Sequence, residues 1–324
     1  MNAPAARLNA AHRPIEPTPQ TLPPGLRRWL LATRPAFLSV TLVAVLLGLA
    51  STHADGVPLH PATVLVTLLF VLVAHAGANV INDYHDRAND ALNSERIFPF
   101  TGGSRLIQNG VLTPAAMARL GYGLLISVIP AGLWLTAHSA AGLMLIGLLG
   151  LLIAWAYSAP PLRLASRGLG EFAIVAGWLL VVAGSDYVQR QAFAALPLAA
   201  GLGYALLVAN ILYINQFPDA TADAAAGKRT VVVRLGRRRA RVGYLVLALL
   251  AALCAPLGVW LGVLPAPTLL VLLTLPLSLA ATHELWHHAE TPAQLAPAIK
   301  LTLTAATLYG LLMAITLVFS KGIS

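Results

Sequence analysis

The sequence predicts an all-α membrane protein in which nine helices cross the bilayer. Two features of composition lead to this prediction: 58% of the residues are hydrophobic and only 10% are charged, against roughly a quarter charged in soluble proteins. A third is the presence of nine apolar runs, each near the roughly 20 residues that a helix needs to cross the hydrocarbon. A chain with so few polar residues cannot cover a water-facing surface, so lipid must be its solvent.

The chain before the first apolar run predicts a disordered cytoplasmic tail over residues 1–28. This segment begins rich in Pro and Ala and contains no apolar core of signal-peptide length. The pair Arg27 and Arg28 fits the basic flank of a first span better than a twin-arginine signal. The membrane domain is then expected to cover residues 29–324.

The nine apolar runs follow one another with short polar connections. Pro and Gly occur inside some of them, which a membrane helix tolerates because neighbouring helices satisfy the freed backbone groups. The predicted spans are residues 35–52, 61–83, 115–136, 140–157, 169–186, 192–214, 241–262, 266–285 and 297–319.

The basic residues predict the orientation of the chain. With a cytoplasmic N-terminus, every Lys and Arg except Arg190 and Lys321 falls on the cytoplasmic side, as the positive-inside rule requires. Positive charge facing anionic membrane lipid explains most of the net charge of +9, so no nucleic-acid partner is expected. We therefore expect a multi-pass protein of a bacterial-type inner membrane.

Two acidic segments repeat one pattern. The chain has seven aspartates, and five of them lie directly after the second and sixth spans. Asn82, Asp86 and Asp90 are spaced by four residues, and Asn215, Asp219 and Asp223 repeat the residue types and the spacing.

A spacing of four places each trio on one helical face, and the predicted topology places both faces on the cytoplasmic side. Aspartates at a helix C-terminus oppose the helix dipole. Carboxylates at a membrane edge therefore indicate function rather than simple solvation.

The residue types in these segments favour a magnesium diphosphate site. Mg²⁺ prefers hard oxygen ligands and shares its coordination with water and substrate phosphate. Basic residues follow each segment, namely Arg105 in TGGSR and Lys228 with Arg229 in GKRT. The Gly102-Gly103-Ser104 stretch would let backbone N–H groups approach phosphates. At the mouth of a membrane bundle, such a site indicates a lipid diphosphate substrate.

The stretch NDYHDRAND, residues 82–90, resembles the NDxxDxxxD signature of the UbiA superfamily of intramembrane aromatic prenyltransferases, and DATAD resembles its second DxxxD. The resemblance implies nine helices around a central cavity and Mg²⁺ that bridges both motifs to an isoprenyl diphosphate. It also implies roles for the matching residues: Asn82, Asp86, Asp90, Asp219 and Asp223 as catalytic, the four aspartates among them as metal ligands, Asp83 as an extra carboxylate, and Lys228 with Arg229 as the basic pair.

Further stretches, such as TGGSRLIQNGVLTP and YSAPPLRLASRGLGE, are similar to the branch that contains 1,4-dihydroxy-2-naphthoate polyprenyltransferase of menaquinone synthesis. This similarity implies transfer of a polyprenyl group to that naphthoate. A 4-hydroxybenzoate acceptor is the alternative. Many 4-hydroxybenzoate enzymes carry Tyr-x3-Lys after the fourth span, whereas Tyr157 is followed at that spacing by Pro161, with Arg163 as the nearest base.

Other residues complete the predicted substrate site. Asn79 extends the face of the first trio by one turn into the membrane. Tyr157 either presents its ring to an allylic cation or belongs to the interfacial aromatic belt, and the sequence does not separate these readings. The predicted substrate-binding residues are Asn79, Asp83, Arg105, Tyr157, Arg163, Asn215, Lys228 and Arg229.

Two other functions deserve comparison with this prediction. HELWH, residues 283–287, matches the HExxH zinc-protease motif, but no third ligand can be named in another span. A transporter would fit many spans with an internal repeat, although matched carboxylates followed by Lys-Arg are not expected there. The sequence identifies no protein partner.

Overall fold

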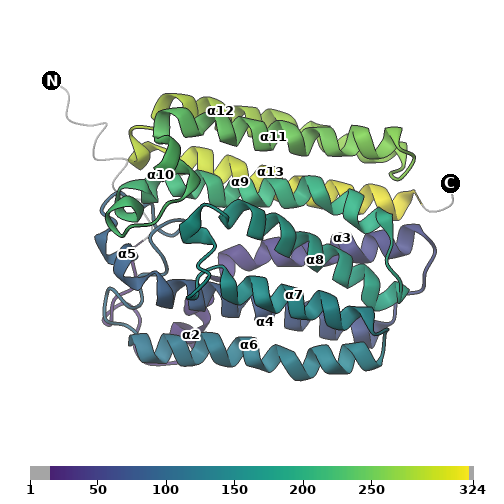
Figure 1. Ribbon diagram of the computed structural model, residues 1–324, viewed down its shortest axis with the longest axis horizontal. Helices are drawn as coiled ribbons and strands as arrows, with labels where there is room; N and C mark the ends of the chain where they lie inside the picture. The colour runs from purple at the N-terminus through teal and green to yellow at the C-terminus, as the bar shows by residue number, and fades with distance from the viewer. Residues whose placement is uncertain (1–14, 321–324) are drawn as a thin grey trace.

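A computed structural model describes residues 15–320, and all the secondary structure assigned within these residues is helical. The long helices lie roughly side by side (Figure 1). They are α3 (Pro35–Ala54), α4 (Pro61–His85), α6 (Pro114–Ala137), α7 (Gly142–Ala156), α8 (Gly170–Arg190), α9 (Ala195–Ala225), α11 (Arg237–Trp260), the pair η3 (Ala266–Thr274) and α12 (Leu275–His288), and α13 (Ala296–Phe319). The short elements are α2 (Leu26–Ala32), α5 (Arg87–Leu92), η2 (Ala165–Arg167), α10 (Val231–Leu235) and η4 (Pro292–Gln294).

The helical membrane fold is confirmed. Within residues 15–320, eight helices are long and apolar enough to cross a membrane, with η3 and α12 counted as one. The one predicted span missing from these eight, residues 140–157, corresponds to α7, an apolar helix of 15 residues. At about 1.5 Å per residue it is about 22 Å long, shorter than the hydrocarbon core of about 30 Å.

Helix α9 is longer than its predicted span. Residues 192–214 are expected to cross the membrane, whereas the helix continues without interruption to Ala225 and has 31 residues. This corresponds to about 46 Å, so its last turns extend beyond the hydrocarbon. The second acidic segment is therefore carried by a continuous helix, in agreement with the helical face predicted for it.

Helix α9 also organises the bundle. It packs against α8 on one side and α11 on the other, and α3 contacts α8, α9 and α13. The short helices α5 and α10 lie together at one end of the bundle, where α4 and α9 both end (Figure 1). The two acidic segments therefore reach the same end of the protein, as the predicted topology requires.

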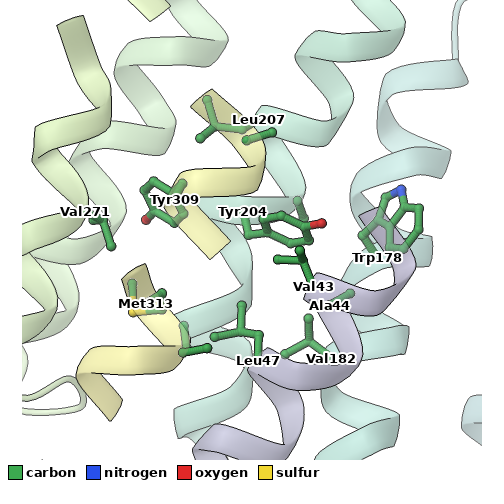
Figure 2. Packing of buried hydrophobic residues seen from close by; sticks show 14 of the residues in the cluster. Val43, Ala44, Leu47, Trp178, Val182, Tyr204, Leu207, Val271, Tyr309 and Met313 are labelled. Atoms are coloured by element: carbon green, nitrogen blue, oxygen red, sulfur yellow. The ribbon is translucent and has the colours of Figure 1, made fainter. Parts of the chain in front are cut away.

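The largest buried cluster joins α3, α8, α9 and α13 (Figure 2). It contains two buried tyrosines whose hydroxyls are satisfied by backbone carbonyls: Tyr204 donates to Val40 at 2.6 Å and Tyr309 to Ala251 at 3.4 Å. Gly310 makes room for Tyr204, because a Cβ there would come within 2.8 Å of its ring. Small residues at these crossings let membrane helices approach closely.

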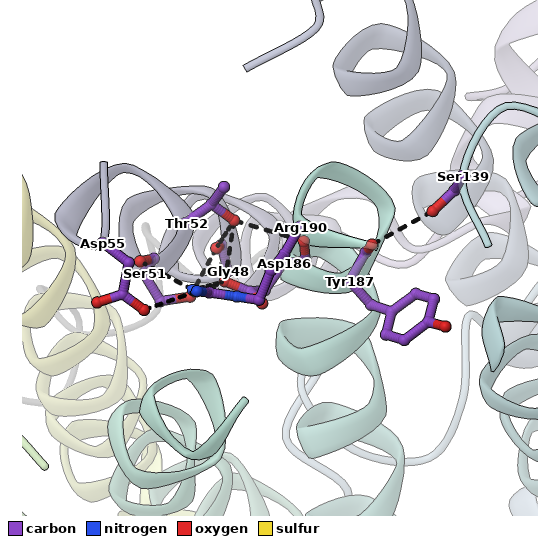
Figure 3. Close-up of polar contacts among 8 residues, drawn as sticks. All are labelled: Gly48, Ser51, Thr52, Asp55, Ser139, Asp186, Tyr187 and Arg190. Atoms are coloured by element: carbon purple, nitrogen blue, oxygen red, sulfur yellow. Dashed lines mark hydrogen bonds and ion pairs between the residues drawn. The ribbon is translucent and has the colours of Figure 1, made fainter. Parts of the chain in front are cut away.

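At the opposite end of the bundle from α5 and α10, a polar cluster joins α3 to α8 (Figure 3). Asp186, 1% exposed, accepts hydrogen bonds from the hydroxyls of Ser51 and Thr52 at 3.0 and 2.9 Å. Arg190 donates to both of its carboxylate oxygens, at 2.7 and 2.8 Å. Asp55 lies 2.7 Å from the same guanidinium. This pairing explains how an aspartate is retained inside a membrane helix.

Part of the predicted tail packs on the protein. Residues 1–14 lie outside the described residues. Leu22 is 3% exposed and joins a cluster with Leu106, Val111 and Met117. For residues 15–28 the structure therefore differs from the predicted disorder, because Leu22 finds an apolar site beside the connection between α5 and α6.

Candidate functional site

A cavity of about 550 Å³ lies among α3, α4, α6, α7, α8 and α9. Its lining changes along its length. Carboxylates and amides from the ends of α4 and α9 and from α5 line one end, whereas aliphatic side chains of α6, α7 and α8 line much of the rest. Such a cavity suits an amphiphile with a polar head and an apolar tail.

The first acidic segment lies across a break between two helices. Helix α4 ends at His85 and α5 begins at Arg87, which leaves Asp86 at the junction. Asn82 Nδ2 donates to Asp86 Oδ2 at 2.9 Å. Asp90 follows on α5 and is 7% exposed. All three members of the first trio line the cavity, although the single helix that the four-residue spacing predicts is interrupted at Asp86.

The second segment faces the first. Asn215, Asp219 and Asp223 lie on one side of α9 and line the same cavity. Two hydrogen bonds connect the segments directly: Asn89 Nδ2 donates to Asp223 Oδ1 at 2.8 Å, and Asn93 Nδ2 donates to Asp219 Oδ1 at 2.5 Å. Because the lower-numbered asparagine pairs with the higher-numbered aspartate, α5 runs antiparallel to the end of α9.

Lys228 bridges the two segments by charge. Its ammonium lies 2.9 Å from Asp86 Oδ2 and 3.3 Å from Asp223 Oδ1. Burial alone would lower the pKa of Lys228, but the carboxylates of Asp86 and Asp223 outweigh burial, so its pKa is raised. The lysine therefore remains cationic and lines the polar end of the cavity.

The polar end holds more negative charge than these contacts neutralise. Burial raises the pKa of Asp90 well above its usual value of 3.8, and the neighbouring carboxylates of Asp83, Asp86 and Asp219 raise it further. The buried side-chain oxygens of Asn89 and Asn215, two residues of the cavity lining, have no hydrogen-bond partner. Unpaired buried oxygens are costly, so the site favours a bound cation with hydrogen-bonding ligands of its own.

The donor set fits Mg²⁺ that is completed by a substrate. Within residues 15–320, no group of three or more His, Cys, Asp or Glu side chains converges as a ready-made metal cage. Mg²⁺ does not need one, because it is commonly bound by one or two carboxylates together with water and substrate phosphate. The oxygen-only donors of the two segments are the ligand type that Mg²⁺ prefers.

The glycine loop closes the polar end. Gly102 and Gly103 both have positive φ, and they line the cavity. The backbone N–H of Ser104 donates to Asp83 Oδ2 at 3.0 Å. Asp83 thus holds the loop instead of facing the cavity, and it is absent from the described lining.

Gly103→Ala is expected to raise the Mg²⁺ concentration for half-maximal activity by about 10-fold or more, the usual effect of disturbing the surroundings of metal ligands. A Cβ at this position would overlap Asp90 Oδ2 and come within 3.1 Å of its Cγ. The measurement is the activity of the purified protein against Mg²⁺ concentration. Gly110→Ala is the matched control, because its φ of +69° is similar to the +73° of Gly103 but nothing lies within 4 Å of its Cβ. Equal effects of the two substitutions would contradict this explanation.

The structure brings most of the predicted site residues to one cavity. Those that line it come from α4, α5 and their junction, from the end of α7, and from α9 and the connection after it; they are Asn79, Asn82, Asp86, Asp90, Tyr157, Asn215, Asp219, Asp223 and Lys228. Tyr157 lies in the lining, which favours the reading in which its ring faces the cavity.

Three predicted diphosphate ligands do not line the cavity. Arg163 and Arg229 are exposed. The backbone of Arg229 is instead held by a 2.7 Å hydrogen bond to the carbonyl of Ser166. Arg105 is buried but donates to the backbone carbonyl of Asp90 at 2.5 Å. A basic residue that follows an acidic motif in the sequence therefore need not face the same cavity, because the connecting loop turns between the motif and the basic residue.

Other functional candidates were missed by sequence reasoning. Arg34 lines the cavity and lies 3.9 Å from Asp83 Oδ1, although it precedes the first span and is far from both motifs in sequence. Asn89 and Asn93 connect the acidic segments. Their spacing of four residues predicts that they share one helical face. It does not predict which residues of the second segment they contact.

Deeper in the cavity, polar side chains are held by neighbouring helices. Asn79 Nδ2 donates to the carbonyl of Thr33 at 3.0 Å. His75 shares a 2.7 Å hydrogen bond with the Thr41 hydroxyl, and its ring meets that of Trp178 edge-on at 5.2 Å. These contacts fix a polar strip along α4 between the acidic end and the apolar part of the cavity.

The HELWH stretch is arranged differently from a zinc site. His283 and His287 are exposed on α12, with ring centroids 4.5 Å apart. No third His, Cys, Asp or Glu joins them among the described residues. Trp286 instead stacks under the guanidinium of Arg241 at 4.6 Å.

Known proteins share these features. The model of the UbiA prenyltransferase family matches residues 38–304. The chain is 27% identical over 301 residues to 1,4-dihydroxy-2-naphthoate octaprenyltransferase of Escherichia coli (strain K12), covering 90% of this chain and 96% of that protein. It is 32% identical over 224 residues to the protein of the same name from Mycobacterium tuberculosis (strain ATCC 25618 / H37Rv), covering 67% and 73%. The structure of a UbiA homolog from Archaeoglobus fulgidus bound to DMAPP and Mg²⁺ has the same fold, with a TM-score of 0.60, 18% identity, and coverage of 89% of this chain and 99% of that chain.

Proposed function

The chain belongs to the UbiA prenyltransferase family, and we propose that it transfers a polyprenyl group from a polyprenyl diphosphate to 1,4-dihydroxy-2-naphthoate in an Mg²⁺-dependent reaction of menaquinone synthesis. The observation that carries this proposal is the meeting of two acidic segments at the polar end of an otherwise largely apolar cavity. A diphosphate head and a polyprenyl tail match the two parts of that cavity.

The polar end would hold the diphosphate together with the metal. Bound Mg²⁺ neutralises phosphate charge and polarises the leaving oxygen. Its proposed ligands are the carboxylates of the two segments, Asp86, Asp90, Asp219 and Asp223. Lys228 lies between the segments, where its charge would stabilise the departing diphosphate.

The apolar part of the cavity would protect the reacting carbon. As the C–O bond to diphosphate breaks, positive charge develops on the allylic group, and aliphatic lining residues of α6, α7 and α8 exclude the water that would capture it. Tyr157 is a lining residue, and the π-face of its ring would stabilise that charge. A ring carbon of an acceptor held against the allylic group then forms the new C–C bond while diphosphate leaves with the electrons of the broken C–O bond. The ring becomes aromatic again when that carbon loses its proton, or its carboxylate as CO₂.

The naphthoate acceptor is supported by the names of the relatives, which are naphthoate octaprenyltransferases. The absence of Tyr-x3-Lys at residues 157–161 and the exposure of Arg163 give no support to 4-hydroxybenzoate. We also propose that the polar end faces the cytoplasm of a bacterial-type inner membrane. Most Lys and Arg residues lie in or next to connections at this end of the bundle, and basic residues are enriched on the cytoplasmic side of membrane proteins.

A panel assay tests the proposed reaction. Membranes containing the protein and Mg²⁺ are supplied with polyprenyl diphosphates of several lengths and with either 1,4-dihydroxy-2-naphthoate or 4-hydroxybenzoate. We expect prenylated naphthoate as the main product and no product when Mg²⁺ is chelated. Efficient prenylation of 4-hydroxybenzoate in preference to the naphthoate would overturn the acceptor assignment, whereas activity that survives chelation would overturn the role of the metal.

A further inference from the structure

The segment before α2 crosses the connection that carries the glycine loop. We call residues 16–22 the N-terminal strap. Glu16 Oε1 accepts a hydrogen bond from Arg96 Nε at 2.7 Å, and Asn109 Nδ2 donates to Glu16 Oε2 at 3.1 Å. Asn109 also donates to the carbonyl of Pro17 at 2.9 Å. The beginning of the strap is therefore tied to both sides of the connection between α5 and α6.

The end of the strap is held separately. Leu22 is buried in the cluster with Leu106 and Val111. Arg28 Nε donates to the carbonyl of Leu22 at 2.7 Å, and its Nη1 donates to the carbonyl of Val111 at 3.1 Å. Both ends of the strap are thus fixed by contacts with the α5–α6 connection. These contacts hold Glu16 in place although it does not belong to a helix.

Arg105 connects the strap to the first acidic segment. Its guanidinium, with a side chain 7% exposed, lies between the two: Nε is 3.5 Å from Glu16 Oε2, and Nη1 donates to the backbone carbonyl of Asp90 at 2.5 Å. Arg105 Nε has no hydrogen-bond partner, so the carboxylate of Glu16 is its nearby counter-charge. Without Glu16, the neighbouring guanidiniums of Arg96 and Arg105 would repel each other.

We infer that Glu16 is a positioning residue for the first acidic segment: it holds Arg105 against the carbonyl of Asp90 and so keeps the Asp90 carboxylate facing the second segment. The effect passes through the backbone, because Arg105 binds the main chain of Asp90 while the Asp90 side chain lines the cavity. The inference rests on the proposed function where it treats Asp90 as a metal ligand, but the contact from Glu16 to Arg105 stands without it.

The test compares Glu16→Gln with Glu16→Asp, which keeps the charge, and with Glu284→Gln as a control. Glu284 is a half-buried carboxylate on α12 that lies 3.8 Å from the imidazole of His288 and outside the cavity lining. Binding of Mn²⁺ as a magnetic substitute for Mg²⁺ is measured by electron paramagnetic resonance on the purified full-length protein. Amide hydrogen exchange is measured over residues 86–110 in the absence of metal.

We expect Glu16→Gln to weaken Mn²⁺ binding by about 10-fold, in the range found for groups that support metal ligands, and to speed exchange over residues 86–110. The kcat at saturating Mg²⁺ should be largely retained, and Glu16→Asp should restore much of the affinity. Glu284→Gln should change neither measurement. Unchanged Mn²⁺ affinity and unchanged exchange in folded Glu16→Gln would overturn the inference. If the unsubstituted protein binds no Mn²⁺, the proposed metal site fails instead, and the exchange rates alone decide the role of Glu16.

Discussion

Alanine in place of Asp86 or Asp219 is expected to reduce turnover by at least about 10³-fold. The two residues belong to different acidic segments, and both line the polar end of the cavity. Loss of either carboxylate would weaken the binding of Mg²⁺, whose stabilisation of developing phosphate charge is worth several kcal/mol, and each 1.36 kcal/mol corresponds to a factor of ten in rate. The measurement is prenyl transfer by purified variants at saturating substrates over a range of Mg²⁺ concentrations.

Glu290→Gln is a suitable control for this experiment, because Glu290 is exposed beyond the end of α12 and does not line the cavity. It should keep nearly full activity. Thermal unfolding should show that both aspartate variants are folded, because Lys228 keeps its contact with Asp223 when Asp86 is removed, and the loss of either carboxylate also relieves repulsion among like charges. Near-normal turnover of either folded variant would remove that aspartate from the proposed metal ligands.

Asp186→Ala is expected to destabilise the protein by about 3–5 kcal/mol, the range for breaking a buried ion pair by removing one partner. The Asp186 side chain is 1% exposed and accepts hydrogen bonds from Arg190, Ser51 and Thr52. Its loss would leave the Arg190 guanidinium without its buried counter-charge, between α3 and α8. Thermal unfolding of the detergent-solubilised protein measures the effect.

The matched control is Asp55→Ala. Asp55 contacts the same guanidinium at 2.7 Å, but its side chain is 43% exposed, so its loss should cost no more than about 1 kcal/mol. A comparable destabilisation by the two substitutions would show that burial does not govern this cluster.

The long helices and the two motifs could be predicted from sequence because each rests on a local pattern. Hydropathy identifies the spans, and a spacing of four residues places Asn82, Asp86 and Asp90 on one face. The same trio recurs at residues 215–223. The predicted topology then places the polar helical faces of both trios on the same side of the membrane. The structure agrees in bringing both trios to one cavity.

The rest of the site depends on contacts between distant segments. Asn89 and Asn93 find Asp223 and Asp219 only because α5 lies antiparallel to the end of α9. Arg105 turns toward the carbonyl of Asp90, with a φ of +65°. Side-chain direction in such connections depends on backbone turns that residue spacing does not encode.

The Asp186 cluster shows the same limit in a membrane helix. An aspartate one turn before Arg190 indicates an ion pair along one helical face. The hydroxyls of Ser51 and Thr52 come from α3, and their approach requires the close crossing of α3 and α8 at Gly48, where a Cβ would lie 2.7 Å from Ser185 Cβ. No pattern within α8 alone predicts that neighbour.

A crystal structure with Mn²⁺ and a non-hydrolysable polyprenyl diphosphate analogue, using the anomalous signal of manganese, tests the central claim most directly. We expect anomalous density between the two acidic segments, with carboxylate oxygens from both α9 and the α4–α5 junction and phosphate oxygens of the same analogue as ligands. Manganese bound by one segment alone, or a diphosphate bound away from both, would contradict the claim that the two segments hold one diphosphate through the metal.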